Sequence, residues 1–442
     1  MRALVFSCFV LTACSAPMTP DAGPRCAAPT GAPVEHNGSR IVADETWAAS
    51  SIHLVSGTIG IGTGATVTIE PCAQVRMKVD SSIIVSGVAT PNTGTLIAEG
   101  DADRPITFVP DNDAAPWSVI EVRGGGSLRL AHVTIRGGGA GNGPFSDASL
   151  RIYGDQNAPP QELARVRNVT ITDSKNYGVF LGQHGTFTSD STNLTVTNSA
   201  KAPIMTWASS LGNLPTGGTF TGNNPDEIGI RGGGGAENVA TNTTMKNLGV
   251  PYRVGTAQSN NAVFNVSSGV AGTVATLTIE AGTTIKFERG ATMQLEPSTG
   301  TNASTAALVA VGTASAPIVF TSAEAAPAAG NWVGLWFGQT PSALNRIDYA
   351  TVEFAGGTTG TQGFSCNMPG RDEAAILILG EPASGFVTNT TIRSSARHGI
   401  DRGWRGAVID FMATNTFENV AGCKQTYPHD TNNGCPMNPP CP

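Results

Sequence analysis

Short segments in which apolar and polar residues alternate recur along the whole chain. At residues 66–70 the order Thr-Val-Thr-Ile-Glu places Val67 and Ile69 on one face of an extended segment and the polar side chains on the other. Further short apolar segments follow at intervals of roughly 8 to 12 residues, a spacing typical of all-β folds. They occupy residues 83–85, 95–98, 106–108, 118–122, 128–130 and 133–135. The pattern predicts many short strands joined by turns.

The same segments return, in the same order, in the second half of the chain. The matched pairs are 66–70 with 276–280 (offset 210), 104–108 with 316–320 (offset 212), Trp117 with Trp332 (offset 215), 133–135 with 352–354 (offset 219) and 166–171 with 387–392 (offset 221). The offset only increases, in small steps, as it does when loops gain residues within a retained strand framework. We infer a tandem duplication, with a first copy at residues 39–230 and a second at 231–442.

The composition favours an all-β chain over a helical one. Charged residues make up 13% of the 442 residues, and 54 residues are glycine. The average charged share is about a quarter. Helix surfaces that face water are normally rich in Lys, Glu and Arg, whereas Gly, Asn and Ser favour turns. The chain therefore has the residues for many turns and few for helix surfaces.

Asn, Thr and Ser dominate the later segments of each copy, as at residues 168–173, 193–198 and 389–393. This succession of short segments resembles right-handed parallel β-helix proteins, in which coils of roughly 20 to 25 residues stack with like residues above one another. The resemblance implies an all-β, right-handed parallel β-helix, a solenoid built from the tandem duplication. Two β-sandwich domains are the alternative. In stacked coils, Asn side chains would satisfy one another across the turns.

The N-terminus has the features of an export signal. Arg2 is followed by a short apolar run and then by small residues. Residues 11–14 (Leu-Thr-Ala-Cys) resemble the lipobox of bacterial lipoproteins, which implies a signal peptide at residues 1–13 and lipidation of Cys14. An ordinary signal peptide is the alternative. By the rule of that family, Ser15 in place of Asp implies the outer membrane or cell surface. Residues 14–38 are predicted to form a flexible tether after the lipidated cysteine.

Export favours disulfides over free thiols. Beyond Cys14 there are six cysteines, an even number: Cys26, Cys72, Cys366, Cys423, Cys435 and Cys441. We expect Cys26 to pair with Cys72, Cys366 with Cys423, and Cys435 with Cys441, which would pin the two ends of the solenoid. A zinc site from Cys423, His429, Cys435 and Cys441 is disfavoured, because zinc-binding pairs usually lie two to four residues apart. No metal and no cofactor are therefore predicted.

Net charge and hydropathy narrow the classes of partner. The formal net charge is -7, with 26 basic and 33 acidic residues, so binding to nucleic acid would gain nothing from counterion release. No run of about 18 apolar residues is present that would span a membrane as a helix. The four glycines at residues 232–235 lack the following Gly-Lys-Ser/Thr of a phosphate-binding loop. The expected partners are a membrane, through the lipid on Cys14, and a polysaccharide or surface protein.

Many β-helix families act on polysaccharides, and two enzyme types have motifs that can be sought. Pectate lyase relatives bind calcium with clustered Asp and use Arg as a base, whereas polygalacturonase relatives carry paired Asp and a Gly-His-Gly loop. Residues 183–185 read Gln-His-Gly, and no Asp-Asp pair occurs in the sequence. Neither motif set is present.

The most conspicuous polar cluster lies at residues 393–405. At the offset of 221, the first copy has uncharged residues where this segment has charged ones; its counterparts are Asn176 for Arg397, Tyr177 for His398, Phe180 for Asp401 and Leu181 for Arg402. Guanidinium groups bind acidic sugars or phosphates, and a Trp stacks on sugar rings. The candidate ligand-binding residues are Arg393, Arg397, Arg402, Trp404 and Arg405. Glu373 and its neighbours Arg371 and Asp372 lie about one coil upstream and would join the same face.

If the chain is an enzyme, His398 and Asp401 would exchange a proton and Arg397 would assist. The competing interpretation of residues 393–405 is an exposed, salt-bridged turn near the end of the solenoid, where charge discourages association of strand edges. Taken together, these features predict a non-enzymatic cell-surface lipoprotein, a structural or adhesive scaffold that binds an extracellular polymer or partner. The alternative is a polysaccharide lyase or glycoside hydrolase of a β-helix family.

Overall fold

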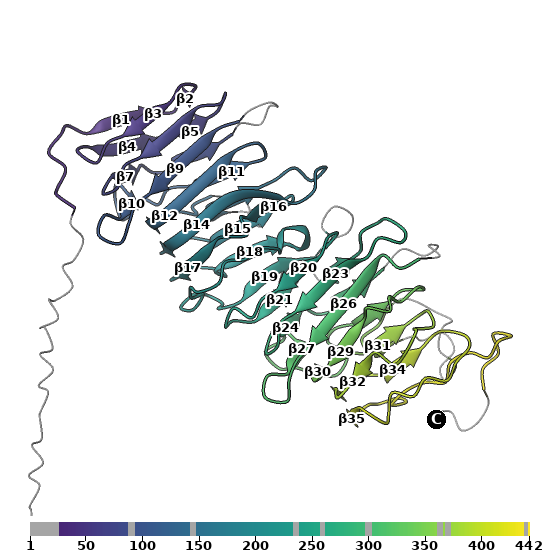
Figure 1. Ribbon diagram of the computed structural model, residues 1–442. Helices are drawn as coiled ribbons and strands as arrows, with labels where there is room; N and C mark the ends of the chain where they lie inside the picture. The colour runs from purple at the N-terminus through teal and green to yellow at the C-terminus, as the bar shows by residue number, and fades with distance from the viewer. Residues whose placement is uncertain are drawn as a thin grey trace, which may run out of the picture.

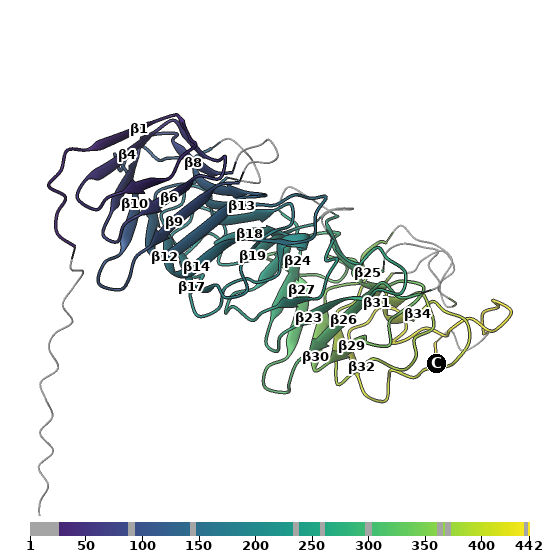
Figure 2. The same cartoon turned by 45° about the horizontal axis from the view of Figure 1, so that its top comes forward.

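A computed structural model describes residues 26–86, 93–141, 147–232, 238–256, 261–296, 303–359, 366, 373–436 and 441–442. The predicted signal peptide and Cys14 lie outside these residues, as do Arg371 and Asp372. The described chain forms an elongated right-handed parallel β-helix, which confirms the predicted fold (Figure 1). A second view shows the same elongated body, with β1 (Val34–Asn37) and β34 (His398–Arg402) toward opposite ends (Figure 2). None of its helices is long and apolar enough to cross a membrane.

Each coil contributes up to three strands, which we call its first, second and third strand positions in chain order. Every strand pairing in the described residues is parallel. In the first copy, the first strand position is occupied by β3 (Glu45–Trp47), β6 (Thr66–Ile69), β9 (Thr95–Glu99), the first parts of β12 (Ser127–Arg136) and β14 (Gln161–Thr172), and β16 (Gly185–Phe187). The second position is occupied by β1, β4 (Ile52–Ser56), β7 (Gln74–Met77), β10 (Ile106–Pro110), the last parts of β12 and β14, and β17 (Thr192–Thr197).

The third position of the first copy is occupied by β2 (Arg40–Ile41), β5 (Thr58–Ile61), β8 (Ser82–Val85), β11 (Val119–Arg123), β13 (Ala148–Tyr153), β15 (Tyr177–Gly182) and β18 (Ile204–Trp207). The single-turn 3-10 helix η1 (Ala208–Ser210) follows β18, and β19 (Ile228–Arg231) begins the passage to the second copy.

The second copy repeats the three positions. The first is occupied by β20 (Thr243–Met245), β23 (Ala275–Ile279), β26 (Ala306–Val311), β29 (Arg346–Asp348) and β32 (Val387–Thr388). The second is occupied by β21 (Tyr252–Val254), β24 (Thr284–Phe287), β27 (Ile318–Ser322), β30 (Ala350–Glu353), β33 (Thr391–Arg393) and β35 (Thr416–Glu418). The third is occupied by β22 (Val263–Val266), β25 (Thr292–Leu295), β28 (Gly334–Phe337), β31 (Ala374–Ile378) and β34.

The alternation in sequence determines which side chains face the interior. In β6, Val67 and Ile69 are buried while the threonines between them are partly exposed, as predicted. One continuous hydrophobic cluster runs from Ile41 to Phe411 through the centre of the coils. Burying an aliphatic side chain of this size contributes roughly 1.5–3 kcal/mol. The repeated inward positions therefore supply most of the stabilisation.

Strand registers carry a match between the two copies from one coil to the next. Val67 pairs with Leu96 and Leu277 pairs with Leu308, so these two pairs occupy matching places at offsets of 210 and 212. Trp117 and Trp332, 215 residues apart, are both fully buried. The offset of 221 also holds, since Ile135 pairs with Ile171 and Val352 with Ile392. These registers agree with the offsets inferred from the sequence.

One predicted match is wrong by two residues. Phe108 pairs with Ile135 and Phe320 with Val352, so Ile135 corresponds to Val352 at an offset of 217. Sequence similarity instead predicts Phe354 as the counterpart of Ile135, at an offset of 219. A slip of two residues leaves inward positions apolar, so similarity alone does not detect it.

Strands that hold the same position in the two copies lie on different faces of the solenoid, shifted by one face. The 14-stranded sheet contains β18, in the third position of the first copy, and continues through β19 to β21, in the second position of the second copy. Its strands follow one another along the body from β5 to β30 (Figure 1). Equivalent residues of the two copies therefore lie on different faces.

Asn residues stack at the bend between the first and second strand positions. Asn168 and Asn193 have positive φ angles of 54° and 55°, a left-handed conformation that Asn tolerates. The Asn193 amide donates to the Asn168 side-chain oxygen at 2.9 Å, and Asn389 donates to Asp348 at 2.9 Å at the same bend of the second copy. The predicted mutual satisfaction of stacked Asn side chains is confirmed.

The ordered chain starts before residue 39. Cys26 forms the predicted disulfide with Cys72, and β1 pairs with β4, so part of the segment predicted as tether belongs to the first coil. This end is closed by rings: Trp47 stacks on His36 with centroids 4.1 Å apart, and His36 Nε2 lies 2.9 Å from His53 Nδ1. Burial lowers the pKa of both histidines.

The two predicted C-terminal disulfides are wrong. Cys366 is bonded to Cys435, and Cys423 to Cys441. The reason is that the tail after β35 continues as a further coil that runs parallel to β34, with parallel bridges from Ile400 to Gln425 and from Arg405 to His429. Proximity in sequence therefore does not predict proximity in the last coil. The zinc alternative is contradicted as well, because its three cysteines are used in two different disulfides.

Candidate functional site

The cluster at residues 393–405 lies on β33, β34 and the turn that follows, and the coil that contains β35 stacks on it. In Figure 2, β34 lies toward the C-terminal end of the body. Arg393 continues a ladder of outward side chains and binds Glu353 with nitrogen–oxygen distances of 2.6 and 2.5 Å. Thr321 also donates to Glu353, at 2.8 Å. Arg397 lies 3.9 Å from Glu373, so the predicted upstream neighbour does join this group. Both guanidinium groups are already paired with carboxylates.

Arg402 is fully buried at the end of the hydrophobic column. It is in register with Ile378, an inward residue of β31. Its guanidinium donates to the carbonyl of Thr426 and, at 2.6 Å, to that of Ile409. Burial lowers its pKa to about 10, although Asp410, Tyr427 and Asp401 act in the opposite direction. Arg402 therefore closes the core and does not face a ligand.

His398 and Asp401 lie on opposite faces of β34, because they are three positions apart and side chains alternate along a strand. His398 Nδ1 accepts the backbone N–H of Cys423 at 3.0 Å, so the neutral ring carries its proton on Nε2. Burial, and secondarily Arg397, lowers the pKa of His398 to about 4. Asp401 accepts from the Thr426 hydroxyl at 3.3 Å. The two side chains do not form the predicted proton-exchange pair.

Trp404 is 2% exposed and cannot stack on a sugar. Its indole N–H donates to the Ala407 carbonyl at 3.0 Å, and its ring meets Phe411 edge-on at 6.4 Å. Arg405 is exposed, with its backbone bridged to His429. His429 and two sulfurs, those of Cys366 and Cys435, lie within 4.8 Å of one another, but the sulfurs are bonded together. The cluster thus serves mainly as the C-terminal cap of the solenoid.

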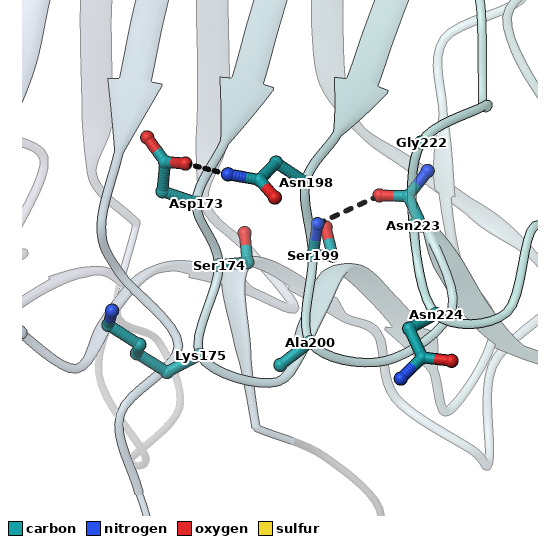
Figure 3. A pocket seen from close by; sticks show the side chains of 9 residues that line it. All are labelled: Asp173, Ser174, Lys175, Asn198, Ser199, Ala200, Gly222, Asn223 and Asn224. Atoms are coloured by element: carbon teal, nitrogen blue, oxygen red, sulfur yellow. Dashed lines mark hydrogen bonds between the residues drawn. The ribbon is translucent and has the colours of Figure 1, made fainter.

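A polar groove occupies the turns of three successive coils in the first copy (Figure 3). Its volume is about 400 Å³. The lining residues are Asp173, Ser174, Lys175, Asn198, Ser199, Ala200, Gly222, Asn223 and Asn224. We call this the amide groove. It spans the turns after β14, after β17 and after residues 217–221, so it runs from coil to coil.

Hydrogen bonds fix the floor of the amide groove. The Asn198 amide donates to the Asp173 carboxylate, and the Asn223 side-chain oxygen accepts the Ser199 N–H at 3.0 Å (Figure 3). The Asn223 amide donates to the carbonyls of Val196 and Phe220, at 2.9 and 3.0 Å. The floor is therefore preorganised, which reduces the entropy lost on binding.

The upper part of the groove retains hydrogen-bonding groups for a ligand. Lys175 and Asn224 are exposed, and their side chains are directed to different sides of the three turns (Figure 3). An ammonium donates three hydrogen bonds, and an amide both donates and accepts. Such groups match the hydroxyls of a sugar. No motif in the sequence predicts this groove, although the Asn-x-Thr-x-Thr pattern at 168–172 and 193–197 marks the coils that carry it.

A second groove of about 300 Å³ lies over β12 and β14. Its charged residues are bound to one another: Arg129 contacts Glu99 at 3.1 Å, and Arg165 lies 3.8 Å from Asp190 and also binds Glu99. The pKa of Asp190 is lowered, chiefly by the hydrogen bond from Thr188. Ligands would have to displace these ion pairs, so this groove has less free hydrogen-bonding capacity than the amide groove.

Residues 256–365 match the family model of the pectate-lyase like beta helix domain. The match covers 110 of the 442 residues and lies in the second copy. It agrees with the observed coils and indicates similarity over that segment. No curated protein and no solved structure gives a significant match.

Replacing Arg402 tests the capping role. Arg402→Ala should destabilise the last coils, because two buried carbonyls lose their donor and each unsatisfied group costs roughly 1–3 kcal/mol. Arg405→Ala, three residues away and exposed, is the matched control and should change the free energy of unfolding little. Urea denaturation followed by circular dichroism measures both. Equal stability of the two variants would contradict the cap.

The buried His398 should make stability depend on pH. Its pKa in the folded protein is about 4, below the ordinary value of 6.5, so the unfolded chain binds the proton first. Its contribution is present above about pH 6.5 and is lost as the pH falls toward 4, by roughly 3 kcal/mol in total. The difference in unfolding free energy between wild type and His398→Asn should shrink over this range. A difference in unfolding free energy that does not change with pH would contradict the lowered pKa of His398.

Proposed function

We propose that this protein is a non-enzymatic, lipid-anchored scaffold of a bacterial cell surface that binds an extracellular polysaccharide along the amide groove. The single observation that carries the proposal is a preorganised polar groove that crosses three coils and has uncommitted amide and ammonium groups. The lipobox-like residues 11–14 support the anchor.

The spacing between the coils that line the groove suits a polysaccharide. Successive coils lie about 4.8 Å apart along the axis, a distance comparable with the length of one sugar ring. Similar groups therefore recur at nearly the repeat of a polysaccharide laid along the solenoid. The binding free energies of the contacts on three coils would add, as they do for linked binding sites.

The charged groups favour binding over catalysis. A general acid needs a pKa raised toward neutrality. Asp190 and Asp348 instead have lowered pKa values; for Asp348, burial acts upward but is outweighed by hydrogen bonds from Asn389, Thr388 and Arg346. Among the described residues of the last coil, His398 and Asp401 do not form an acid–base pair. These features support the scaffold.

A lyase or hydrolase is the second candidate, favoured by the similarity of residues 256–365 to a pectate-lyase like domain. Such an enzyme would place its site on the second copy, whereas the amide groove lies on the first. The two candidates therefore predict effects of substitutions in different copies. A surface protein is the other partner compatible with a scaffold.

Binding is tested by affinity electrophoresis of the full chain in gels that contain acidic or neutral polysaccharides. One polysaccharide should retard the wild type, and Lys175→Ala with Asn224→Ala should weaken binding at least tenfold, since the charge-assisted hydrogen bond of Lys175 alone contributes roughly 1.5–3 kcal/mol. Lys424→Ala, an exposed lysine of the last coil, is the control. Retention of full affinity by the double variant would contradict the groove. Release of reducing ends or unsaturated products, with or without calcium, would establish the enzyme.

The anchor is tested separately in a bacterial host. The wild type should fractionate with membranes and incorporate labelled fatty acid, and Cys14→Ala should abolish the incorporation because the thiol is the attachment atom. Cys8→Ala, within the predicted signal peptide, is the control and should retain the label. Absence of label in the wild type would contradict lipidation without affecting the polysaccharide test.

A further inference from the structure

A flat array of threonines lies beside the amide groove. Three successive coils, at residues 168–173, 193–198 and 217–222, each carry two threonines separated by one apolar residue. The intervening and preceding apolar residues are buried: Val169, Ile171, Leu194, Val196 and Phe220. The threonines alternate with them and face outward.

Strand register aligns these threonines in two columns. Thr170 pairs with Thr195, and Thr172 pairs with Thr197. The next coil continues both columns with Thr219 and Thr221, because the Val196 N–H donates to the Thr219 carbonyl at 2.8 Å. We call these six residues the threonine array. The preceding coils extend the first column with Thr134 and Thr107, which pair with each other.

The array is a nearly rectangular lattice. Neighbouring strands lie about 4.8 Å apart, and side chains two residues apart on a strand are separated by roughly 6.6 Å. A β-branched side chain has few allowed χ1 values, so each hydroxyl and methyl group stays close to one position. The lattice is thus set by the backbone and needs little ordering on binding.

The array is uncharged and its hydroxyls are available. Within the described residues, the side chains of Thr170, Thr172, Thr195 and Thr197 have no hydrogen-bond partner, whereas Thr219 and Thr221 bond to each other at 3.0 Å. The columns are bordered by Asn168, Asn193 and Gly217 on one side and by Asp173, Asn198 and Gly222 on the other. One coil before the array, Arg136 is in register with Thr172 and is ion-paired with Asp113 at 2.8 Å. Over the six threonines themselves, water contacts mainly hydroxyl and methyl groups.

We propose that the threonine array binds the surface of ice. Its two regular spacings suit an ordered lattice of water, in which hydroxyls would hydrogen-bond water molecules while methyl groups fill the gaps between them. The six residues include no aromatic side chain to stack on sugars and no large apolar anchor of the kind that dominates protein interfaces. This site is distinct from the amide groove and does not depend on polysaccharide binding.

The second copy provides a matched control. Thr391 pairs with Thr416 in the second strand position, but Arg393 pairs with Glu418 where the first copy has the second column of threonines. Charged side chains impose their own hydration and interrupt the lattice. Tyr at position 195 would project from the centre of the array, whereas Tyr at position 416 would make the same change outside it.

Microscopy of single ice crystals in a nanolitre osmometer tests the proposal on the full chain. The wild type should facet the crystals and hold them against growth below the melting point, and Thr416→Tyr should do the same. Thr195→Tyr should give round crystals, as in buffer, while its circular dichroism and thermal unfolding stay unchanged. Thr197→Lys serves as a second variant if Thr195→Tyr does not fold.

Several outcomes would overturn the inference. These are round crystals with the wild type, or equal loss of faceting in Thr195→Tyr and Thr416→Tyr. Loss of binding to insoluble cellulose or chitin in Thr195→Tyr, without any effect of the wild type on ice, would instead assign the array to a crystalline glycan. The Lys175→Ala, Asn224→Ala double variant should retain faceting, which separates this site from the amide groove.

Discussion

Hydrogen bonding between successive coils is the constraint on which the rest of this structure depends. Each strand is bonded in parallel to the strand one coil before and one coil after, so a residue lies directly above its counterpart. Inward columns then need only be apolar, and outward columns become ladders of like or complementary side chains. The ion pair of Arg393 with Glu353, the stacked Asn side chains and the threonine array all arise from this one arrangement.

The sequence predicted the coil well because the alternation of β6 and its repeats depends on local periodicity. It predicted the last coil poorly. Chemistry at the end of a solenoid depends on which strand comes last, and no local pattern records that. Arg402 was interpreted as a ligand-binding residue because it is charged, yet its place in register with Ile378 makes it part of the core boundary. The predicted pairings of Cys366 and Cys423 are wrong for the same reason, since the additional coil after β35 is not visible in the periodicity.

Both ends of the hydrophobic column are closed by polar or aromatic side chains. Burying the polar ones in the middle of the column would cost free energy. At the start, His36 and His53 share a hydrogen bond beneath Trp47. At the end, Arg402 and His398 meet backbone groups of the coil that follows β35, and Gln425 is bonded to Phe411 and Asp410. A stack of open coils would otherwise expose apolar side chains and unpaired strand edges, which promote association with other chains. The residues that most resembled an active site are those that prevent this.

The one-face rotation at β19 has a consequence for how duplication shaped the surface. A flat partner laid along one side of the molecule meets second-position strands of the first copy but first-position strands of the second. Doubling the chain therefore lengthened the body without placing two equivalent recognition surfaces on the same side. A planar partner meets each such surface only once. Freed from matching each other, the two copies could diverge, one retaining neutral threonines where the other acquired Arg393 and Glu418.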